Sequence, residues 1–343
     1  MLETVRVYAK RTDKVYLLLC LFSSAMAVLM LASWAAEQGG GFAVDEITGQ
    51  ITGIGDYRRA LVQAAASGMG VLIALALSTI DYRSLVKVWP FHVAFTWGLV
   101  LPTLFIHNLS LGPLTIGYNA GDTDNYSWYR LGGFTFQPTE LAKISFILTF
   151  AMHLNNVRSR INEPRELAKL LAHLMAPILL IHIQGDDGTA LIFAGIGVVM
   201  LFAGGLSLPL ALGGLGLAAA GGAALLLAKP DLLKGYQFQR ILAVLTPEDP
   251  ALADIAYQQN KAAMAIGTGG LAGQGLFQDE SIFIPNAWND FIYSYLANAL
   301  GFLGALAVLA LLFAIMLRTL HTAAASADLL GRLLATGVFA ALF

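Results

Sequence analysis

Asp290 is a carboxylate at the edge of an apolar helix, where it could take part in chemistry. It stands in the segment Pro285-Asn286-Ala287-Trp288-Asn289-Asp290-Phe291, directly before a long apolar run. Charged side chains at the edge of a membrane are costly, so they are frequently functional. An acidic residue at the start of a helix can also be a simple cap, stabilised by about 0.3 to 1 kcal/mol through the helix dipole. The residues alone leave both interpretations open.

Lys143 is a second charged residue in an apolar setting. It lies six residues after Gln137 in a run that begins at Pro138, which places it about 9 Å along a helix that rises about 1.5 Å per residue. An ammonium group at that depth needs a partner. Glu140, at i−3 on the same helix face, offers a local structural pair. Asp290, arriving at the same outer level from another helix, offers a functional one.

Two other polar motifs have weaker interpretations. Asp186 and Asp187, between two glycines, suit a tight turn, although two adjacent carboxylates could also help to bind a divalent cation. The Gly267-Thr268-Gly269-Gly270 run could cradle a phosphate or simply form a flexible loop. The six histidines show no metal-ligand spacing.

The composition identifies the kind of protein that must hold these residues. Hydrophobic residues make up 57% of the chain and charged residues only 12%, against roughly 25% charged in soluble domains. The mean hydropathy is +0.69. The chain is therefore expected to be an integral membrane protein of the all-α class. The single cysteine, Cys20, excludes a disulfide framework within the chain.

The apolar runs predict a polytopic helical bundle with about nine spans, treated as one membrane domain over residues 1–343. Each run approaches the length of about 20 residues that a bilayer requires. The runs cover residues 15–36, 60–80, 89–106, 138–154, 170–183, 189–204, 208–228 and 291–317, and a ninth begins at 329. The last run reaches the end of the sequence after about fifteen residues, so we expect either a short ninth helix or a truncated chain.

Basic residues set the expected orientation. The amino-terminal segment and the loops 81–87 and 158–169 are rich in Lys and Arg, which predicts that they are cytoplasmic. Arg318 and His321, between the eighth span and the ninth, are also placed inside. The loops 37–57, 107–137 and 184–188 then lie outside. The long polar segment 235–290, between the seventh and eighth spans, is also external, and loops of that length are usually functional.

Several motifs together resemble the SEDS family, the RodA and FtsW type of proteins of bacterial cell-wall synthesis. They occur in the order of the family and extend over nearly the whole chain. They are Asp81-Tyr82-Arg83, Trp128-Tyr129-Arg130-Leu131-Gly132, Phe136-Gln137-Pro138-Thr139-Glu140-Leu141-Ala142-Lys143, Gln184-Gly185-Asp186-Asp187-Gly188-Thr189-Ala190-Leu191, Tyr236-Gln237, Arg240-Ile241, Tyr257-Gln258, Ala265 to Leu271, Gly273-Gln274-Gly275, Pro285 to Phe291 and Leu300-Gly301-Phe302-Leu303-Gly304.

The resemblance implies ten membrane helices, a large external loop after the seventh, and a peptidoglycan glycosyltransferase. Such enzymes polymerise lipid II outside the bacterial cytoplasmic membrane, usually with a class B penicillin-binding protein as transpeptidase. By resemblance Asp290 is the catalytic carboxylate and Lys143 its partner. The expected substrate-binding residues are Trp128, Arg59, Arg240, Gln137 and Glu140, with Arg58 beside Arg59 as an alternative.

The chain also departs from the family pattern. The usual Pro-Glu-x-His-Thr-Asp-Phe is here Pro285 to Phe291 with Asn286, Trp288 and Asn289 at the changed positions, and the acidic pair expected in the eighth helix is Asn298-Ala299. The Arg expected before Trp128 is Ser127, and the chain ends before the family's final motif. These changes make a weakly active scaffold for the transpeptidase an alternative to the enzyme. A lipid II flippase is another alternative, although a flippase needs polar residues across the full thickness of the membrane and those of this chain gather on the external side. A divalent cation, Mg²⁺ or Mn²⁺, is an open expectation.

Overall fold

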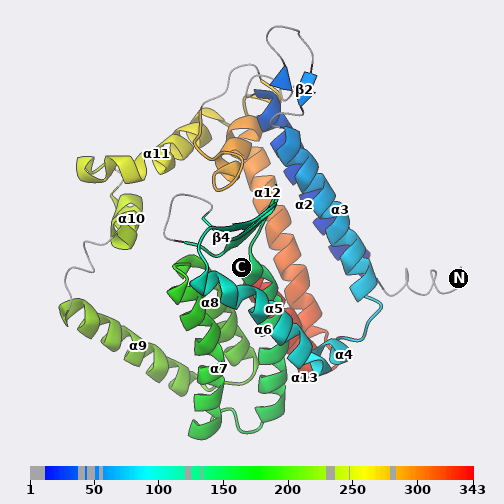
Figure 1. Ribbon diagram of the computed structural model, residues 1–343, viewed down its shortest axis with the longest axis vertical. Coiled ribbons are helices and arrows are strands. Elements are labelled where there is room, and N and C mark those ends of the chain that lie inside the picture. The colour runs from blue at the N-terminus through cyan, green and yellow to red at the C-terminus, as the bar shows by residue number, and fades with distance from the viewer. Residues whose placement is uncertain are drawn as a thin grey trace, which may run out of the picture. The chain divides into compact units, whose positions relative to one another are not determined.

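The structure, a computed structural model, describes residues 12–37, 43–44, 51–53, 57–119, 125–132, 134–228, 236–246, 248–278 and 283–343. The chain divides into two compact units (Figure 1). The first unit comprises residues 1–77 and 217–315, and the second comprises residues 78–216 and 316–343. The two units are described separately below.

The first unit is built around helices that are apolar along most of their length. Helix α2 (Lys14–Glu37) packs along α3 (Tyr57–Leu77) (Figure 1). Two short antiparallel strands, β1 (Ala43–Val44) and β2 (Ile51–Gly53), lie between these helices in the chain. The unit also holds the end of α9 (Leu208–Ala228), α10 (Tyr236–Leu245), α11 (Ala253–Thr268) and most of α12 (Ile292–Ala324).

The second unit places α6 at its centre. Helix α6 (Pro138–Val157) packs against α5 (Trp89–Phe105), α7 (Pro164–Ile183), α8 (Asp187–Ala203) and α13 (Leu329–Leu342). Phe146, Phe150 and Phe193 form the aromatic centre of this core. Helices α6 and α7 both begin at a proline, a residue whose missing N–H costs nothing in the first turn.

The same unit contains a four-stranded antiparallel sheet in the order β3-β4-β5-β6. Its strands are Leu109–Leu111, Leu114–Tyr118, Trp128–Leu131 and Phe134–Phe136. The sequence predicts only a polar external stretch here. Strands of three to five residues are too short for an alternating hydrophobic pattern to stand out.

The predicted helical membrane fold is confirmed, and each expected span coincides with a helix to within about seven residues at either end. Among the described residues, four helices are long and apolar enough to cross a bilayer. They are Lys14–Glu37, Tyr57–Leu77, Pro164–Ile183 and Ile292–Ala324. The expected number of spans stays a prediction.

Helix α12 is broken at Gly301, whose φ of 70° lies in the left-handed region. The break frees the carbonyl oxygens of Asn298 and Ala299, which accept hydrogen bonds from the backbone N–H groups of Gln274 (2.9 Å) and Gly275 (2.9 Å). Backbone groups freed within an apolar environment must find other partners. The segment after α11 provides them.

The backbone N–H groups that follow the break also find hydrogen-bond partners in the segment after α11. The N–H groups of Phe302 and Leu303 donate to the carbonyl oxygens of Gly270 (2.8 Å) and Leu271 (3.2 Å). A Cβ atom at Gly273 would collide with the carbonyl of Ala299. The glycines of this segment therefore allow close backbone packing against α12. This contact explains them better than the phosphate cradle or the flexible loop that the sequence suggested.

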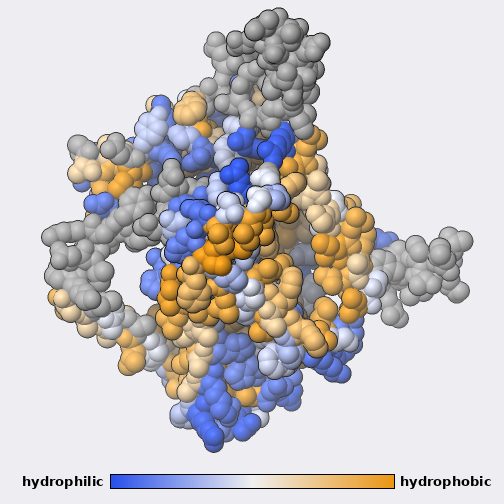
Figure 2. Space-filling view, viewed as in Figure 1, coloured by the Kyte–Doolittle hydropathy of each residue, from blue (hydrophilic) through white to orange (hydrophobic). Residues whose placement is uncertain are grey.

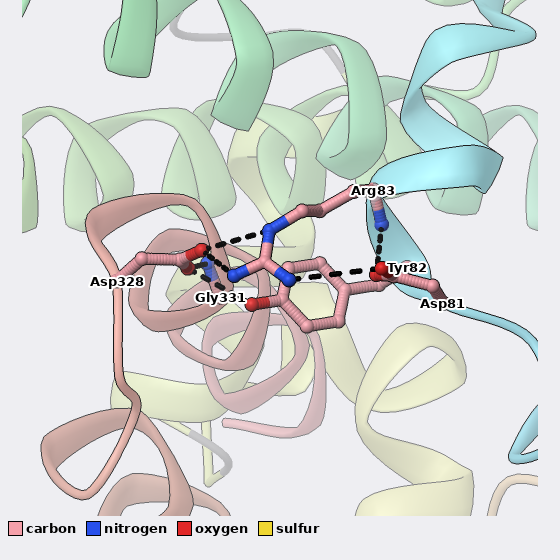
Figure 3. A network of polar contacts seen from close by, with 5 residues as sticks. All are labelled: Asp81, Tyr82, Arg83, Asp328 and Gly331. Atoms are coloured by element: carbon pink, nitrogen blue, oxygen red, sulfur yellow. Dashed lines mark hydrogen bonds and ion pairs between the residues drawn. The ribbon is translucent and has the colours of Figure 1, made fainter.

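One end of the second unit is tied by a polar network around Asp328 (Figure 3). The Asp328 carboxylate accepts hydrogen bonds from the Tyr82 hydroxyl (3.0 Å), from the Gly331 backbone N–H (2.7 Å) and from two nitrogens of the Arg83 guanidinium. Arg83 also lies 3.6 Å from Asp81. Tyr82 and Arg83 belong to α4 (Tyr82–Lys87), a short helix that follows α3 where the sequence predicts a loop. This segment and the loop before α13 thus lie on the same side of the unit, as their predicted cytoplasmic placement requires.

Candidate active site

Asp290 is exposed at the end of the loop that leads into α12. A series of turns precedes it, and the first helical N–H, that of Ile292, donates to the carbonyl of Asn289 (3.3 Å). Within the described ranges no group donates a hydrogen bond to the Asp290 carboxylate. The geometry thus favours a free carboxylate over the capping interpretation, and a free carboxylate can accept a proton.

Two residues before Asp290, Trp288 stacks on Arg59. The guanidinium carbon of Arg59 lies 4.4 Å from the ring centroid of Trp288 and 5.0 Å from that of Trp34. Trp34, on α2, is 8% exposed, whereas Trp288 is 38% exposed. Such cation–π contacts are worth roughly 0.5 to 2 kcal/mol each. The pair of indole rings therefore fixes a positive charge on α3 beside the loop that carries Asp290.

A polar cluster that the sequence did not reveal joins α2 to α12. The buried Tyr295 hydroxyl lies 2.7 Å from Ser33 Oγ and donates to Glu37 Oε1 (2.5 Å). Ser33 Oγ also accepts from the backbone N–H of Phe277 (2.9 Å). The other carboxylate oxygen of Glu37 is buried and has no hydrogen-bond partner among the described residues. The Ser33 and Glu37 pair, four residues apart at the end of an apolar run, is the only local signal of this cluster in the sequence.

Lys143 forms the local ion pair that its spacing allows. Its Nζ lies 2.9 Å from Glu140 Oε1, and the Lys143 side chain is 13% exposed while that of Glu140 is 59% exposed. Both residues belong to the second unit, whereas Asp290 belongs to the first. The partnership of Lys143 with Asp290 stays a prediction.

Gln137 is engaged in holding two loops together. Its Nε2 donates to Asp186 Oδ2 (2.6 Å) and to Ser127 Oγ (3.3 Å), and Ser127 is completely buried. Trp128 follows as the first residue of β5 and is half-buried. The two loops predicted to be external are thus joined at the same side of the second unit. Gln137 acts there as a structural link between them.

Asp186 and Asp187 are both occupied by neighbouring groups. Asp186 caps α8 by accepting from the N–H of Thr189 (3.0 Å) and from its hydroxyl (2.9 Å), and Asp187 is hydrogen-bonded to His182. The described residues contain no group of three or more His, Cys, Asp or Glu side chains that could hold a metal ion. The turn interpretation is favoured for this pair, and the binding of Mg²⁺ or Mn²⁺ stays a prediction.

Arg240 lies on α10, but its side chain is outside the described residues. Asn298 lies where the family pattern has a carboxylate. Its amide donates to the carbonyl of Ala265 (3.0 Å) and to Thr268 Oγ1 (2.9 Å), both on α11. A carboxylate could not donate either bond. In this chain the position supports the packing of α11 against α12.

Comparison with known proteins decides the family. The family described as "Cell cycle protein", named for FtsW, RodA and SpoVE, matches residues 44–343. This chain belongs to that family. A probable peptidoglycan glycosyltransferase FtsW from Geobacter sp. (strain M18) is 34% identical over 72% of this chain and 66% of its own length. The peptidoglycan glycosyltransferase MrdB of Escherichia coli (strain K12) is 31% identical over 84% of this chain and 74% of its own length.

Solved structures of FtsW/RodA/SpoVE-like proteins share the fold. A peptidoglycan synthase complex, described as coordinating polymerization and crosslinking, matches with a TM-score of 0.69 at 22% identity, over 96% of this chain and 84% of that chain. The rod shape determining protein RodA of Thermus thermophilus matches with a TM-score of 0.54 at 22% identity, over 94% and 80% of the two chains. The fold and the apolar helices identify the chain as a multi-pass membrane protein. Its sequence relatives, at 31% to 34% identity over most of the chain, place it in the peptidoglycan glycosyltransferase class.

Proposed function

We propose that this protein polymerises lipid II at the extracytoplasmic face of the bacterial cytoplasmic membrane, with Asp290 as the general base. The observation that supports this role most directly is the exposed Asp290 carboxylate, without a hydrogen-bond partner in the described part of the chain, at the end of a loop fixed by Trp288 and Arg59. A catalytic base must be free to take a proton. The amino terminus is proposed to be cytoplasmic.

In the proposed reaction Asp290 removes the proton of an acceptor sugar hydroxyl. The hydroxyl oxygen forms a bond to the anomeric carbon of the donor, and the bond from that carbon to the pyrophosphate oxygen breaks. Undecaprenyl pyrophosphate leaves with the electron pair, so it needs cations rather than an acid. A single displacement inverts the anomeric configuration, which gives a β-linked product from an α-linked donor.

Positive charge for the leaving group is assigned to Arg59, with Lys143 and Arg240 as further candidates. Arginine suits this role because its guanidinium binds phosphate oxygens through two parallel N–H groups. Trp128, Gln137 and Glu140 stay as proposed substrate contacts on the second unit. The proposed partner is a class B penicillin-binding protein that crosslinks the product.

One observation favours a second candidate, a weakly active scaffold for that transpeptidase. Asn298 replaces a family carboxylate and serves as a hydrogen-bond donor between α11 and α12. That position therefore cannot supply a second negative group near the site. A scaffold would keep the fold and the partner but would produce little polymer.

The test is polymerisation of purified lipid II by the purified protein, with and without a transpeptidase. We expect Asp290→Asn to reduce the rate by roughly 10²- to 10⁴-fold, the usual contribution of a general base. Glu248→Gln, which changes an exposed carboxylate elsewhere in the same loop, is the matched control and should leave the rate unchanged. Full activity of Asp290→Asn would remove Asp290 from the mechanism. A wild-type protein that forms no polymer under either condition would support the scaffold.

A further inference from the structure

The second unit contains a cavity of about 520 Å³ between α5, α6 and α7, a volume in the range of ligand-binding pockets. Each helix contributes one face, since its lining residues recur every three or four positions. The lining residues are Trp89, Val93 and Trp97 of α5, Phe146, Thr149, Met152, His153 and Asn156 of α6, and His173, Ala176, Pro177 and Leu180 of α7. Most of this wall is apolar.

The outer surface beside the cavity is of the kind that faces lipid. On α5, Trp89, which lines the cavity, is 44% exposed, and on α7 Leu179, next to the lining residue Leu180, is 50% exposed. Large apolar side chains exposed on neighbouring helices of a membrane protein are in contact with hydrocarbon. The cavity is therefore adjacent to bilayer lipid.

A chain of polar contacts runs along the wall formed by α6 and α7. The Thr149 hydroxyl donates to the Ser145 carbonyl (3.0 Å) and lies 3.3 Å from His173 Nε2, and the Nδ1 atoms of His173 and His153 are 3.1 Å apart. Because the Thr149 hydroxyl already donates its hydrogen to Ser145, His173 must donate from Nε2 to Thr149 Oγ1. In this tautomer His173 Nδ1 carries no hydrogen and is an acceptor, so His153 donates to it from its own Nδ1. His153 Nε2 is then a hydrogen-bond acceptor that no described residue satisfies.

The end of the cavity near His153 and Asn156 adjoins a basic junction, the segment 158–169 between α6 and α7. Figure 2 shows hydrophilic side chains gathered where these two helices join. The junction carries four cations and two carboxylates, for a net charge of +2: Arg158, Arg160, Arg165 and Lys169 against Glu163 and Glu166.

Ion pairing in the junction leaves part of its positive charge available. Glu166 is paired with Lys169 (2.9 Å) and lies 3.9 Å from Arg160. Arg158 and Arg165 are exposed and make no ion pair within the described residues. Lys169 precedes His173 by one helical turn, so the cationic end and the cavity share a face of α7.

We propose that this cavity holds an acyl chain of an anionic phospholipid whose headgroup carries hydroxyl groups, with phosphatidylglycerol as the type. The acyl chain lies along the apolar wall, a headgroup hydroxyl donates to His153 Nε2, and the phosphate lies against Arg158 and Arg165. Basic pockets between membrane helices bind anionic headgroups in this way. The site is independent of Asp290 and of the proposed glycosyl transfer.

The test is titration of the purified full-length protein in detergent with phosphatidylglycerol, phosphatidylcholine or undecaprenyl phosphate, followed by native mass spectrometry. Ala176→Phe should fill the cavity and weaken phosphatidylglycerol binding about tenfold or more. Ala172→Phe, one turn earlier on the same helix, exposed and outside the cavity, should not. The double change Arg158→Gln and Arg165→Gln should weaken binding about tenfold, and Lys87→Gln, an exposed cation of α4, should have no effect.

Each result bears on the proposal. Stronger binding of phosphatidylglycerol than of phosphatidylcholine, lost in Ala176→Phe and retained in Ala172→Phe, supports it. Equal binding of the two phospholipids, or equal loss in both phenylalanine variants, overturns it. Cavity-dependent binding of undecaprenyl phosphate in place of phosphatidylglycerol overturns the assignment to a bilayer phospholipid. A matching Tm for the two phenylalanine variants establishes that both are folded.

Discussion

At the scale of single residues, Trp288 takes over a position that the family pattern gives to histidine. Its ring covers the Arg59 guanidinium, which is also in contact with Trp34. The side chain that departs from the family pattern therefore makes a contact of its own. This aromatic ring replaces a polar side chain and holds a cation beside the Asp290 loop.

We expect Trp288→Ala to slow lipid II polymerisation more than Trp288→Phe does. Phenylalanine keeps an aromatic face for Arg59, whereas alanine removes a contact worth roughly 0.5 to 2 kcal/mol, which corresponds to a rate loss of between about twofold and thirtyfold. Initial rates with purified lipid II measure the effect. If the alanine and phenylalanine variants have equal rates, the stacking of Trp288 on Arg59 does not position the loop.

The family resemblance pointed to Asp290 and Arg59, whose roles stay predictions, but the sequence contained no sign of the cluster of Ser33, Glu37 and Tyr295. Ser33 and Tyr295 are 262 positions apart in the chain, and Glu37 and Tyr295 are 258 apart. Neither α2 nor α12 carries a motif that points to the other helix. These hydrogen bonds form only because α2 and α12 pack against each other, and a single sequence does not show which helices pack together.

At the scale of elements, the sequence predicted the helices well because membrane spans are long apolar runs, but it missed the break in α12. The run from 291 to 317 predicts one continuous span, and Gly301, although part of the Leu300 to Gly304 motif, does not by itself indicate a break. The break becomes visible only when the N–H groups of Phe302 and Leu303 are seen to donate to the segment after α11. That partner segment lies in the long loop, whose structure the sequence left open.

Gly301→Ala should destabilise the protein, because φ at this residue is 70° and a Cβ atom would meet the backbone of Gly273. Left-handed backbone at a non-glycine residue costs of order 1 to 3 kcal/mol before any clash is counted. Gly98→Ala is the matched control, since nothing lies within 4 Å of a Cβ atom there and alanine favours a helix. Thermal unfolding should show a lower Tm for the first variant only. A similar Tm for both would mean that the break is not required.

At the scale of the whole molecule, the placement of Lys and Arg predicted which loops share a side. Two contacts within the second unit agree with this predicted placement. Gln137 is hydrogen-bonded to Asp186, and both belong to segments predicted to be external. Arg83 is paired with Asp328, and both belong to segments predicted to be cytoplasmic. The sequence could predict this sorting because charge controls insertion into the membrane. It could not predict which residues meet across each side.

The Asp328 network gives the stability of the second unit an expected dependence on pH. The backbone N–H of Gly331, together with the Arg83 guanidinium, lowers the pKa of the Asp328 carboxyl. An unfolded aspartate has a pKa of about 3.9. Because the pKa is lower in the folded protein, the stabilisation is present above about pH 4 and is lost as the pH falls through the folded value.

We therefore expect Asp328→Asn to lower the Tm at neutral pH, since the amide can still accept from Gly331 but cannot pair with Arg83. The difference from the wild type should begin to shrink below about pH 4, where the carboxyl of the unfolded wild-type chain becomes protonated. It should disappear once the pH falls through the lower folded pKa and the folded carboxyl is protonated as well. Asp249→Asn provides the control, because that carboxylate accepts a backbone N–H from Ala251 (2.9 Å) in a different loop. A Tm difference between Asp328→Asn and the wild type that stays constant across this pH range would show that the charge of Asp328 does not hold α13 to the loop after α3.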